Sequence, residues 1–118
     1  MRNKFDNIRD WLYVDDHVDA IIKTLQHSKI GETYCIGSNS TKTNLQVVEA
    51  ICEILDEKRK PKVSYKTLIS FVKDRPGHDR RYAMGITKAK EMLGWYPEIE
   101  WDEGLKSTVE WYKKNNDW

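Results

Sequence analysis

The sequence has little cysteine and no long apolar run, and both absences narrow the classes of protein to which it can belong. Its 118 residues include only Cys35 and Cys52, which form no CxxC pair and no zinc-ligand spacing with any of the three histidines. We therefore expect reduced, mostly packed thiols and no metal site. No stretch approaches the roughly 20 apolar residues of a membrane span, and the polar start leads into no signal-peptide core. These absences predict a cytoplasmic protein with no membrane partner.

The sequence also lacks an excess of charge of either sign. Twenty basic side chains against nineteen acidic ones give a formal net charge of +1, which does not favour nucleic acid as a partner. Hydrophobic residues make up 39% and aromatics 11%, which is too apolar for general disorder. At this length we expect a single domain over residues 1–118.

The first third of the chain alternates strand and helix signals. Trp11–Val14 is a run of strand formers, and Asp15 and Asp16 directly after it offer a helix cap. The helix that follows should bury one apolar face, formed by Val18, Ile21, Ile22 and Leu25. Residues 32–37 then read as a second strand between glycines. Residues 38–42 form a polar loop.

A longer helix should start at about Asn44 and run to about Glu57. Thr43 and Gln46 match a capping box, in which each side chain bonds to the backbone of the other residue. The apolar stripe of this helix consists of Val47, Ala50, Ile51 and Leu55.

The last half of the chain predicts shorter elements. Residues 67–72 favour a strand, and residues 73–78 form a loop because a Pro-Gly pair breaks regular structure. Thr87 should cap a short helix that ends at Gly94. A final helix from about Asp102 to Lys114 should bury Leu105, Val109 and Tyr112. The fold class is therefore mixed α and β.

The densest polar cluster is residues 74–82, where turn residues lie among guanidinium and imidazole groups. This combination suits phosphate or diphosphate oxygens, and Arg75 and His78 could face one anion. An equally weighted interpretation pairs Arg80 and Arg81 with nearby carboxylates or a helix end. His78 is the histidine favoured for function because its local sequence is a turn.

Two other positions have a functional and a structural interpretation. Arg9, next to Asp10 and Trp11, is a candidate anion donor, and the alternative is an ion pair at the edge of the core. The amide of Asn44 could contact a ligand at the start of its helix, although such residues more often act as caps. The acidic pairs 15–16 and 102–103 are assigned to capping rather than to acid–base catalysis.

Five segments together resemble the C-terminal, substrate-binding part of the dTDP-glucose 4,6-dehydratase family, within the extended short-chain dehydrogenase/reductase superfamily. They are IRDWLYVDDH (8–17), GETYCIG (31–37), NLQVV (44–48), DRPGHDRRYA (74–83) and LGWYP (93–97), in family order across nearly the whole chain. The resemblance implies an α/β fragment of a Rossmann-type fold without its dinucleotide-binding half. It also implies a nucleotide-diphosphate sugar, dTDP-glucose, as the ligand.

The resemblance assigns substrate-binding positions that bind chiefly around the diphosphate and nucleoside. They are Arg9, Asn44, Asp74, Arg75, Pro76, Gly77 and His78. The family reaction oxidises the glucose C4 hydroxyl with bound NAD, eliminates water across C5 and C6, and returns the hydride to C6. Two departures stand out: Cys35 replaces the usual Asn, and Met84-Gly85 replaces an apolar residue followed by Asp. The second removes a helix-capping carboxylate, which leaves Thr87 as the local cap.

The parts of the family needed for catalysis are missing from this sequence. Its scattered glycines form no G-x-G-x-x-G loop, and no tyrosine has a lysine four residues later. We therefore expect no catalytic residue and no cofactor site in this chain, with NAD belonging to the complete family enzyme. Its enzyme status stays open: it resembles the substrate-binding third of a dehydratase, for which we expect a homo-oligomer or a separate catalytic half as partner. The alternatives are a fragment of a related nucleotide-sugar epimerase or decarboxylase, and a non-catalytic interaction module.

Overall fold

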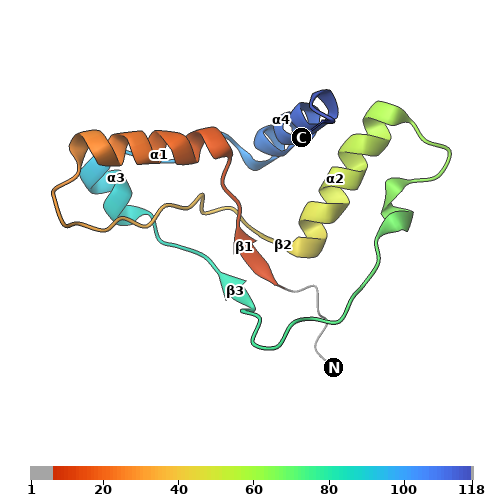
Figure 1. The fold of residues 1–118 in the computed structure, drawn as a ribbon, viewed down its shortest axis with the longest axis horizontal. Coiled ribbons are helices and arrows are strands. Elements are labelled where there is room, and N and C mark those ends of the chain that lie inside the picture. Colours follow the sequence, from red (N-terminus) through yellow and green to blue (C-terminus); the bar gives the residue numbers. More distant parts are fainter. Residues whose placement is uncertain (1–6, 118) are drawn as a thin grey trace.

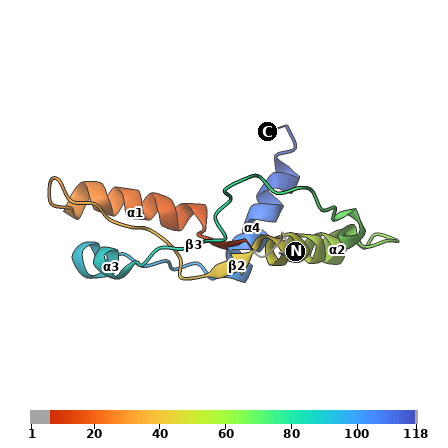
Figure 2. The same ribbon diagram turned by 90° about the horizontal axis from the view of Figure 1, so that it is seen from below.

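The computed structural model describes residues 7–117 and consists of helices arranged around a small three-stranded sheet (Figure 1). The elements are β1 (Ile8–Asp10), α1 (Val14–His27), β2 (Thr41–Thr43), α2 (Asn44–Arg59), the 3-10 helix η1 (Tyr65–Leu68), β3 (Arg81–Tyr82), α3 (Thr87–Leu93) and α4 (Trp101–Lys114). Figure 2 shows α1 and α3 at one end of the molecule and α2 at the other. The radius of gyration is 17.2 Å, whereas a compact domain of about 100 residues has roughly 13 Å. The structure is therefore open and flat.

The sheet is centred on β1, which is flanked by β2 and β3. β1 pairs antiparallel with β2, Arg9 opposite Lys42, and parallel with β3, where Arg9 is aligned with Tyr82. The strand predicted over Trp11–Val14 is wrong, because the strand lies at Ile8–Asp10 and Val14 already begins α1. Strand position is decided by hydrogen-bonding partners more than 30 residues away along the chain, which local propensity does not encode.

The core is small and lies between α1, α3 and the segment that follows α3. It consists of Ala20, Ile86, Ala89, Leu93 and Trp95, with Leu12, Tyr34 and Ile36 packed against it. Trp95 is fully buried, and its indole Nε1 donates a 3.1 Å hydrogen bond to the carbonyl of Asp16. Because the indole N–H has this partner, the whole ring can be buried without leaving a polar group unpaired.

The predicted capping role of Asp15 and Asp16 is wrong. Tyr13 occupies the cap position of α1 and makes no side-chain cap bond, and both aspartates lie in the first helical turn. Asp16 is instead buried, and its Oδ2 accepts a 3.0 Å hydrogen bond from the backbone N–H of Ile99. This carboxylate ties the start of α1 to the segment that leads into α4.

The orientation predicted for α1 is also wrong, because its apolar face is exposed. At 3.6 residues per turn, positions 14, 18, 21, 22 and 25 fall on one face, and all five are exposed, Leu25 to 83%. The residues that α1 buries are Ala20 and Asp16, on the opposite side of the helix. The described residues therefore leave the most apolar face of α1 uncovered.

Local signals for α2 and α4 are confirmed. The capping box is present: Gln46 N donates to Thr43 Oγ1 over 3.1 Å, and Thr43 N donates to Gln46 Oε1 over 2.8 Å. α2 and α4 lie within two residues of their predicted bounds, and Gly94 ends α3 in the left-handed conformation with φ 62°. In α2, Val47 is buried, and Ala50, Ile51 and Leu55 are partly buried.

Five smaller predictions differ from the structure. Residues 67–72 contain the end of η1 and no strand, Thr87 is the first residue of α3 rather than its cap, and Tyr112 is exposed although Val109 is buried. Residues 32–37 form no strand, because no neighbouring strand within residues 7–117 provides hydrogen bonds. Cys52 is buried as expected, but Cys35, in this segment, is exposed.

Candidate functional site

The side chain of Arg9 links the central strand β1 to the loop at 74–79. Its Nη2 lies 2.8 Å from Nε2 of His78 and donates to the carbonyl of Asp79 over 3.0 Å. Its Nη1 donates to the carbonyl of Ile8 over 2.7 Å. None of these three partners is a carboxylate, so within residues 7–117 the positive charge of Arg9 has no acidic partner.

His78 lies between Arg9 and Asp74. A guanidinium can only donate, so Nε2 of His78 accepts from Arg9 and the ring proton resides on Nδ1. Nδ1 then donates to Oδ1 of Asp74 over 2.7 Å, and the same oxygen accepts from the backbone N–H of Arg75 over 2.9 Å. These bonds, the one from His78 first, lower the pKa of Asp74 below the usual aspartate range. The charge of the Asp74 carboxylate is thus partly offset within the loop by these hydrogen bonds.

We expect the carboxyl group of Asp74 to titrate below ordinary exposed aspartates. Because its pKa is lowered in the folded protein, the His78–Asp74 link stabilises the loop above the unfolded pKa and is lost as pH falls through the folded pKa. The measurement is an NMR pH titration of the Asp74 carboxyl carbon in the native chain and in His78→Ala. The variant should titrate at a higher pH than the native chain, and superimposable curves would contradict the link.

Asn7 is a site residue that sequence reasoning missed. Asn7 is 8% exposed, and its side chain donates a hydrogen bond to the carboxylate of Asp74. Its Nδ2 lies 3.0 Å from Nδ1 of His78, beside the His78–Asp74 hydrogen bond. Its backbone carbonyl accepts a 3.0 Å hydrogen bond from the N–H of Asn44. Asn7 therefore joins the start of β1, the start of α2 and the 74–78 loop. A single polar residue before a strand carries no pattern that would have revealed this.

The remaining predicted site residues lie around this cluster. Asn44 begins α2 and is held through its backbone by Asn7. Pro76 and Gly77 form the tip of the loop, with Gly77 at φ 69°. The guanidinium of Arg75 is exposed and has no partner among residues 7–117. The structure brings Arg9, Asp74 and His78 into contact and leaves Arg75 free to meet a ligand.

The sequence also allowed Arg9, Arg80 and Arg81 to serve only as partners in structural ion pairs. Within the described part of the chain, neither Arg80 nor Arg81 forms an ion pair, and the carbonyl of Arg80 accepts from Ile8 N over 2.7 Å. Arg9 likewise makes no ion pair with a carboxylate there. The loop is therefore attached to β1 through hydrogen bonds, and its guanidinium charge is not neutralised by carboxylates.

The neighbours of Arg9 in the Arg-Asp-Trp triplet hold the surrounding chain. Asp10 Oδ1 accepts from Ser38 Oγ, from Ser38 N over 3.1 Å and from Ser40 N over 3.2 Å. Trp11 packs edge-to-face on Trp101, with centroids 6.1 Å apart, and its Nε1 donates to the carbonyl of Lys42 over 3.3 Å. The triplet thus fixes the turn before β2 on one side and α4 on the other.

Gly37→Ala is expected to destabilise the protein by about 1–3 kcal/mol. A Cβ at position 37 would lie 2.3 Å from Oδ2 of Asp10, so the carboxylate that holds Ser38 would have to move. Urea unfolding measures the change, and Gly85→Ala is the matched control because nothing lies within 4 Å of its Cβ position. Equal effects of the two substitutions would contradict the proposed close contact.

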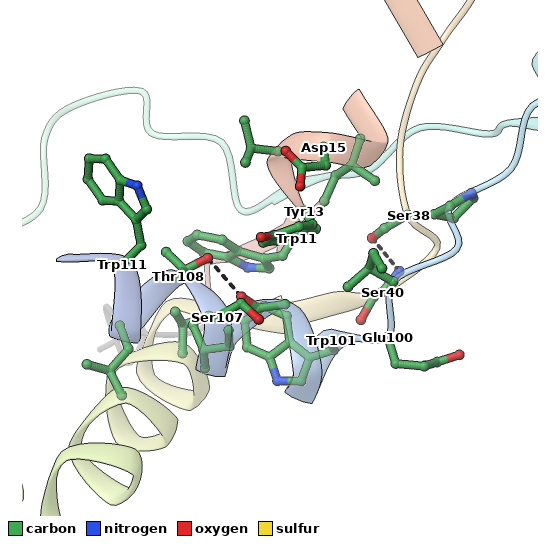
Figure 3. A pocket seen from close by; sticks show the side chains of 18 of the residues that line it. Trp11, Tyr13, Asp15, Ser38, Ser40, Glu100, Trp101, Ser107, Thr108 and Trp111 are labelled. Atoms are coloured by element: carbon green, nitrogen blue, oxygen red, sulfur yellow. Dashed lines mark hydrogen bonds between the residues drawn. The ribbon is translucent and has the colours of Figure 1, made fainter. Parts of the chain in front are cut away.

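A separate cavity of about 720 Å³ lies between the start of α1, α2 and α4 (Figure 3). Its walls include Trp11, Tyr13, Trp101 and Trp111, with Asp15 and Glu100 also lining it (Figure 3). No Arg, Lys or His among the described residues lines it, so its chemistry suits an apolar group and not a phosphate. The cavity is therefore distinct from the Arg9 cluster.

Two searches of the described residues gave negative results. No group of three or more His, Cys, Asp or Glu side chains within residues 7–117 could hold a metal ion. None of the helices in that range has both the length and the apolar character needed to cross a membrane.

Comparisons with known proteins agree on one family. A family model described as GDP-mannose 4,6 dehydratase matches residues 3–108. The dTDP-glucose 4,6-dehydratase 1 of Escherichia coli (strain K12) is 48% identical over 115 residues, and the Salmonella typhimurium dTDP-glucose 4,6-dehydratase is 49% identical. Each match covers 98% of this chain and 32% of the relative, so the chain spans about a third of their length.

Solved structures show the same coverage. The dTDP-glucose 4,6-dehydratase of Bacillus anthracis in complex with NAD superposes with a TM-score of 0.84 at 42% identity, over 98% of this chain and 34% of that one. The Streptomyces venezuelae dTDP-glucose 4,6-dehydratase with NAD and TYD bound gives 0.82 at 32% identity, with the same shares. A UDP-glucose 4-epimerase of Thermotoga maritima with UDP-glucose gives 0.80 at 31% identity, over 98% and 35%.

Proposed function

This chain belongs to the GDP-mannose 4,6 dehydratase family, and we propose that it is the substrate-binding portion of a dTDP-glucose 4,6-dehydratase. Its ligand is a nucleotide-diphosphate sugar, bound at Arg9, Asn44 and the loop Asp74, Arg75, Pro76, Gly77 and His78. The observation that carries the proposal is the uncompensated guanidinium charge of Arg9, attached by His78 to the loop that bears Arg75.

The geometry supports a diphosphate as the recognised group. Asp74, the carboxylate that contacts His78, is engaged by that side chain and by the backbone of Arg75, so its charge is partly offset. The guanidinium of Arg75 is exposed and that of Arg9 is half-buried, and neither has a carboxylate partner within residues 7–117. Guanidinium forks match phosphate oxygens. Asn44, positioned through Asn7, supplies an amide at the start of α2.

An epimerase fragment is the second candidate, supported by the UDP-glucose 4-epimerase that superposes with a TM-score of 0.80. A diphosphate site of the same kind would serve either reaction. The dehydratase is favoured because its Escherichia coli relative is 48% identical, against 31% for the epimerase.

The residues of this chain do not fit a dinucleotide cofactor such as NAD. A dinucleotide loop needs three closely spaced glycines between a strand and a helix. The junctions from β1 to α1, β2 to α2 and β3 to α3 contain a single glycine, Gly85. We therefore derive no step through NAD for this chain.

The isolated chain, given dTDP-glucose and added NAD, is expected to form no 4-keto-6-deoxy sugar product. The reason is that no hydride carrier can be bound by its own residues and no Tyr-x-x-x-Lys pair is present. The measurement is product formation against a protein-free blank. Turnover above that blank would show that the catalytic groups lie elsewhere in this sequence.

The proposed ligand is tested by NMR titration of the chain with dTDP and with inorganic sulfate. We expect the amides around Arg9, Asn44 and residues 75–78 to shift with dTDP, with a dissociation constant no tighter than about millimolar because the open site stays wet. Sulfate should shift the amide resonances of the loop by a smaller amount than dTDP does. If neither ligand perturbs these amides, the proposed function is wrong.

A further inference from the structure

Lys42 is a half-buried cation that no carboxylate balances within the described residues. It lies in β2, and its ammonium is 5.6 Å from the ring centroid of Trp101, at the start of α4. A cation above an aromatic ring keeps its full charge. Within residues 7–117 this ammonium forms no ion pair and no hydrogen bond, so its three N–H donors are available to a ligand.

The side chains of Lys42 and Arg9 start from the same face of the sheet. The two residues lie directly opposite each other in the antiparallel pair of β1 and β2, and β2 leads directly into α2 (Figure 1). Opposite residues of such a pair point to the same side, with Cβ atoms about 4.5–5.5 Å apart. Two cationic side chains are therefore neighbours on adjacent strands.

The carboxylate that follows Arg9 in the chain does not compensate this pair. Asp10 is the next residue of β1, so its side chain points to the opposite face. It accepts hydrogen bonds there from Ser38 and Ser40. On its other flank, Arg9 is aligned with Tyr82 of β3, which bears no carboxylate. Two positive charges without an acidic partner among residues 7–117 therefore lie next to each other.

Two neighbouring cations of this kind favour a bound anion. Like charges directly opposite each other destabilise a strand pair, and an anion in contact with both replaces their repulsion by attraction. Arg9 uses three of its five N–H groups within the chain, so two remain for a ligand. The ammonium of Lys42 adds three more. This set of donors suits a diphosphate, which presents several acceptor oxygens.

We propose that Lys42 is a further binding residue of the diphosphate site, where its ammonium donates to a phosphate oxygen beside the guanidinium of Arg9. The diphosphate then lies over the sheet, with the 74–78 loop on the β3 side of Arg9 and Lys42 on the β2 side. Lys42 precedes Asn44 by two residues, so β2 brings both to this site. The inference rests on the proposed function for the identity of the ligand, and on the strand register for the choice of residue.

A purely structural role for Lys42 predicts a different effect on stability. Lys42→Met keeps an unbranched apolar stem against Trp101 and removes the charge. If Lys42 served only to stabilise the fold through Trp101, this variant would melt at a lower temperature and would bind ligand as the native chain does. A binding residue behaves in the opposite way. Without ligand and at low ionic strength, we expect Lys42→Met to melt at the native temperature or higher, because the repulsion with Arg9 is relieved.

The decisive measurement is an NMR titration of the chain with inorganic pyrophosphate and with dTDP. We expect Lys42→Met to raise both dissociation constants about threefold or more, the size expected for one ion pair in a wet site, and Lys42→Arg to restore most of the affinity. Lys62→Met is the matched control, because it removes the same charge from an exposed side chain. Lys62 lies beyond the far end of α2, whose 16 residues span about 24 Å. Unchanged binding by Lys42→Met, or equal weakening by both methionine variants, would overturn the proposal.

The two probes separate this inference from the proposed function. Pyrophosphate carries the diphosphate without a nucleoside. If pyrophosphate binds as tightly as dTDP and Lys42→Met weakens both, the role of Lys42 stands and the nucleotide ligand is wrong. If dTDP shifts the amides of residues 75–78 and Lys42→Met binds it as the native chain does, the proposed function stands and the role of Lys42 is wrong. Amides of Arg9 and Lys42 that do not shift with pyrophosphate would also overturn the proposal.

Discussion

Replacing Trp95 with alanine is expected to lower the free energy of unfolding by about 3–5 kcal/mol, the usual cost of removing a buried Trp. Trp95 is the largest fully buried side chain in the described structure, and the core around it has few other members. The substitution also leaves the carbonyl of Asp16 without its indole donor. Because a domain of this size has about 5–15 kcal/mol in total, the variant should lose a large share of its stability.

Urea unfolding followed by fluorescence and circular dichroism measures this effect. Trp111→Ala is the matched control, since Trp111 is 44% exposed and contacts Tyr112 edge-to-face at the surface of α4. We expect Trp111→Ala to lower the free energy of unfolding by about 1 kcal/mol or less. The loss of unfolding free energy for Trp95→Phe should lie between those of the two alanine variants. Phenylalanine keeps most of the ring volume but loses the indole N–H. Similar midpoints for the two alanine variants would mean that Trp95 does not hold the core.

Features encoded within one turn of helix could be predicted from the sequence. The capping box at Thr43 and Gln46 places the start of α2 because both partners lie three residues apart. Gly94 ends α3 because a left-handed residue is needed there. The loop at 73–78 follows from its Pro-Gly pair. None of these depends on distant contacts.

Features decided by distant partners could not be predicted in the same way. The position of β1 depends on Thr41–Thr43 and on Arg81–Tyr82, and the segment at 32–37 fails to become a strand because it lacks a neighbour. The periodicity of α1 correctly indicates an amphipathic helix, but it does not say which layer covers the apolar face. Within residues 7–117 no element covers this face, so it is exposed.

The residues of the candidate site were likewise predictable only in part. The resemblance selected Arg9, Asp74 and His78, and the structure shows these three in contact. It did not select Asn7, whose importance arises from three segments that meet only in the folded chain. Nor did it show that Arg9 has no carboxylate partner among residues 7–117, which depends on the geometry of the folded chain.

Arg75→Ala is expected to abolish the proposed binding of dTDP by the isolated chain. A charge-assisted hydrogen bond is worth about 1.5–3 kcal/mol when desolvated, and less in a site that stays wet. Starting from a dissociation constant of about millimolar, even a tenfold loss moves binding beyond what an NMR titration can saturate. The guanidinium of Arg75 has no partner among the described residues, so its removal should leave the fold and the His78–Asp74 link intact.

The control for Arg75→Ala must remove a positive charge without touching the site. Lys60 lies in the connector after α2, at the left-handed C-terminal cap, with its backbone N–H bonded to Asp56. Lys60→Ala should leave dTDP binding unchanged, because binding depends on the directed donors of the 74–78 loop and not on net charge. If Lys60→Ala weakens binding as much as Arg75→Ala, the interaction is general electrostatic attraction and this loop is not a specific diphosphate site.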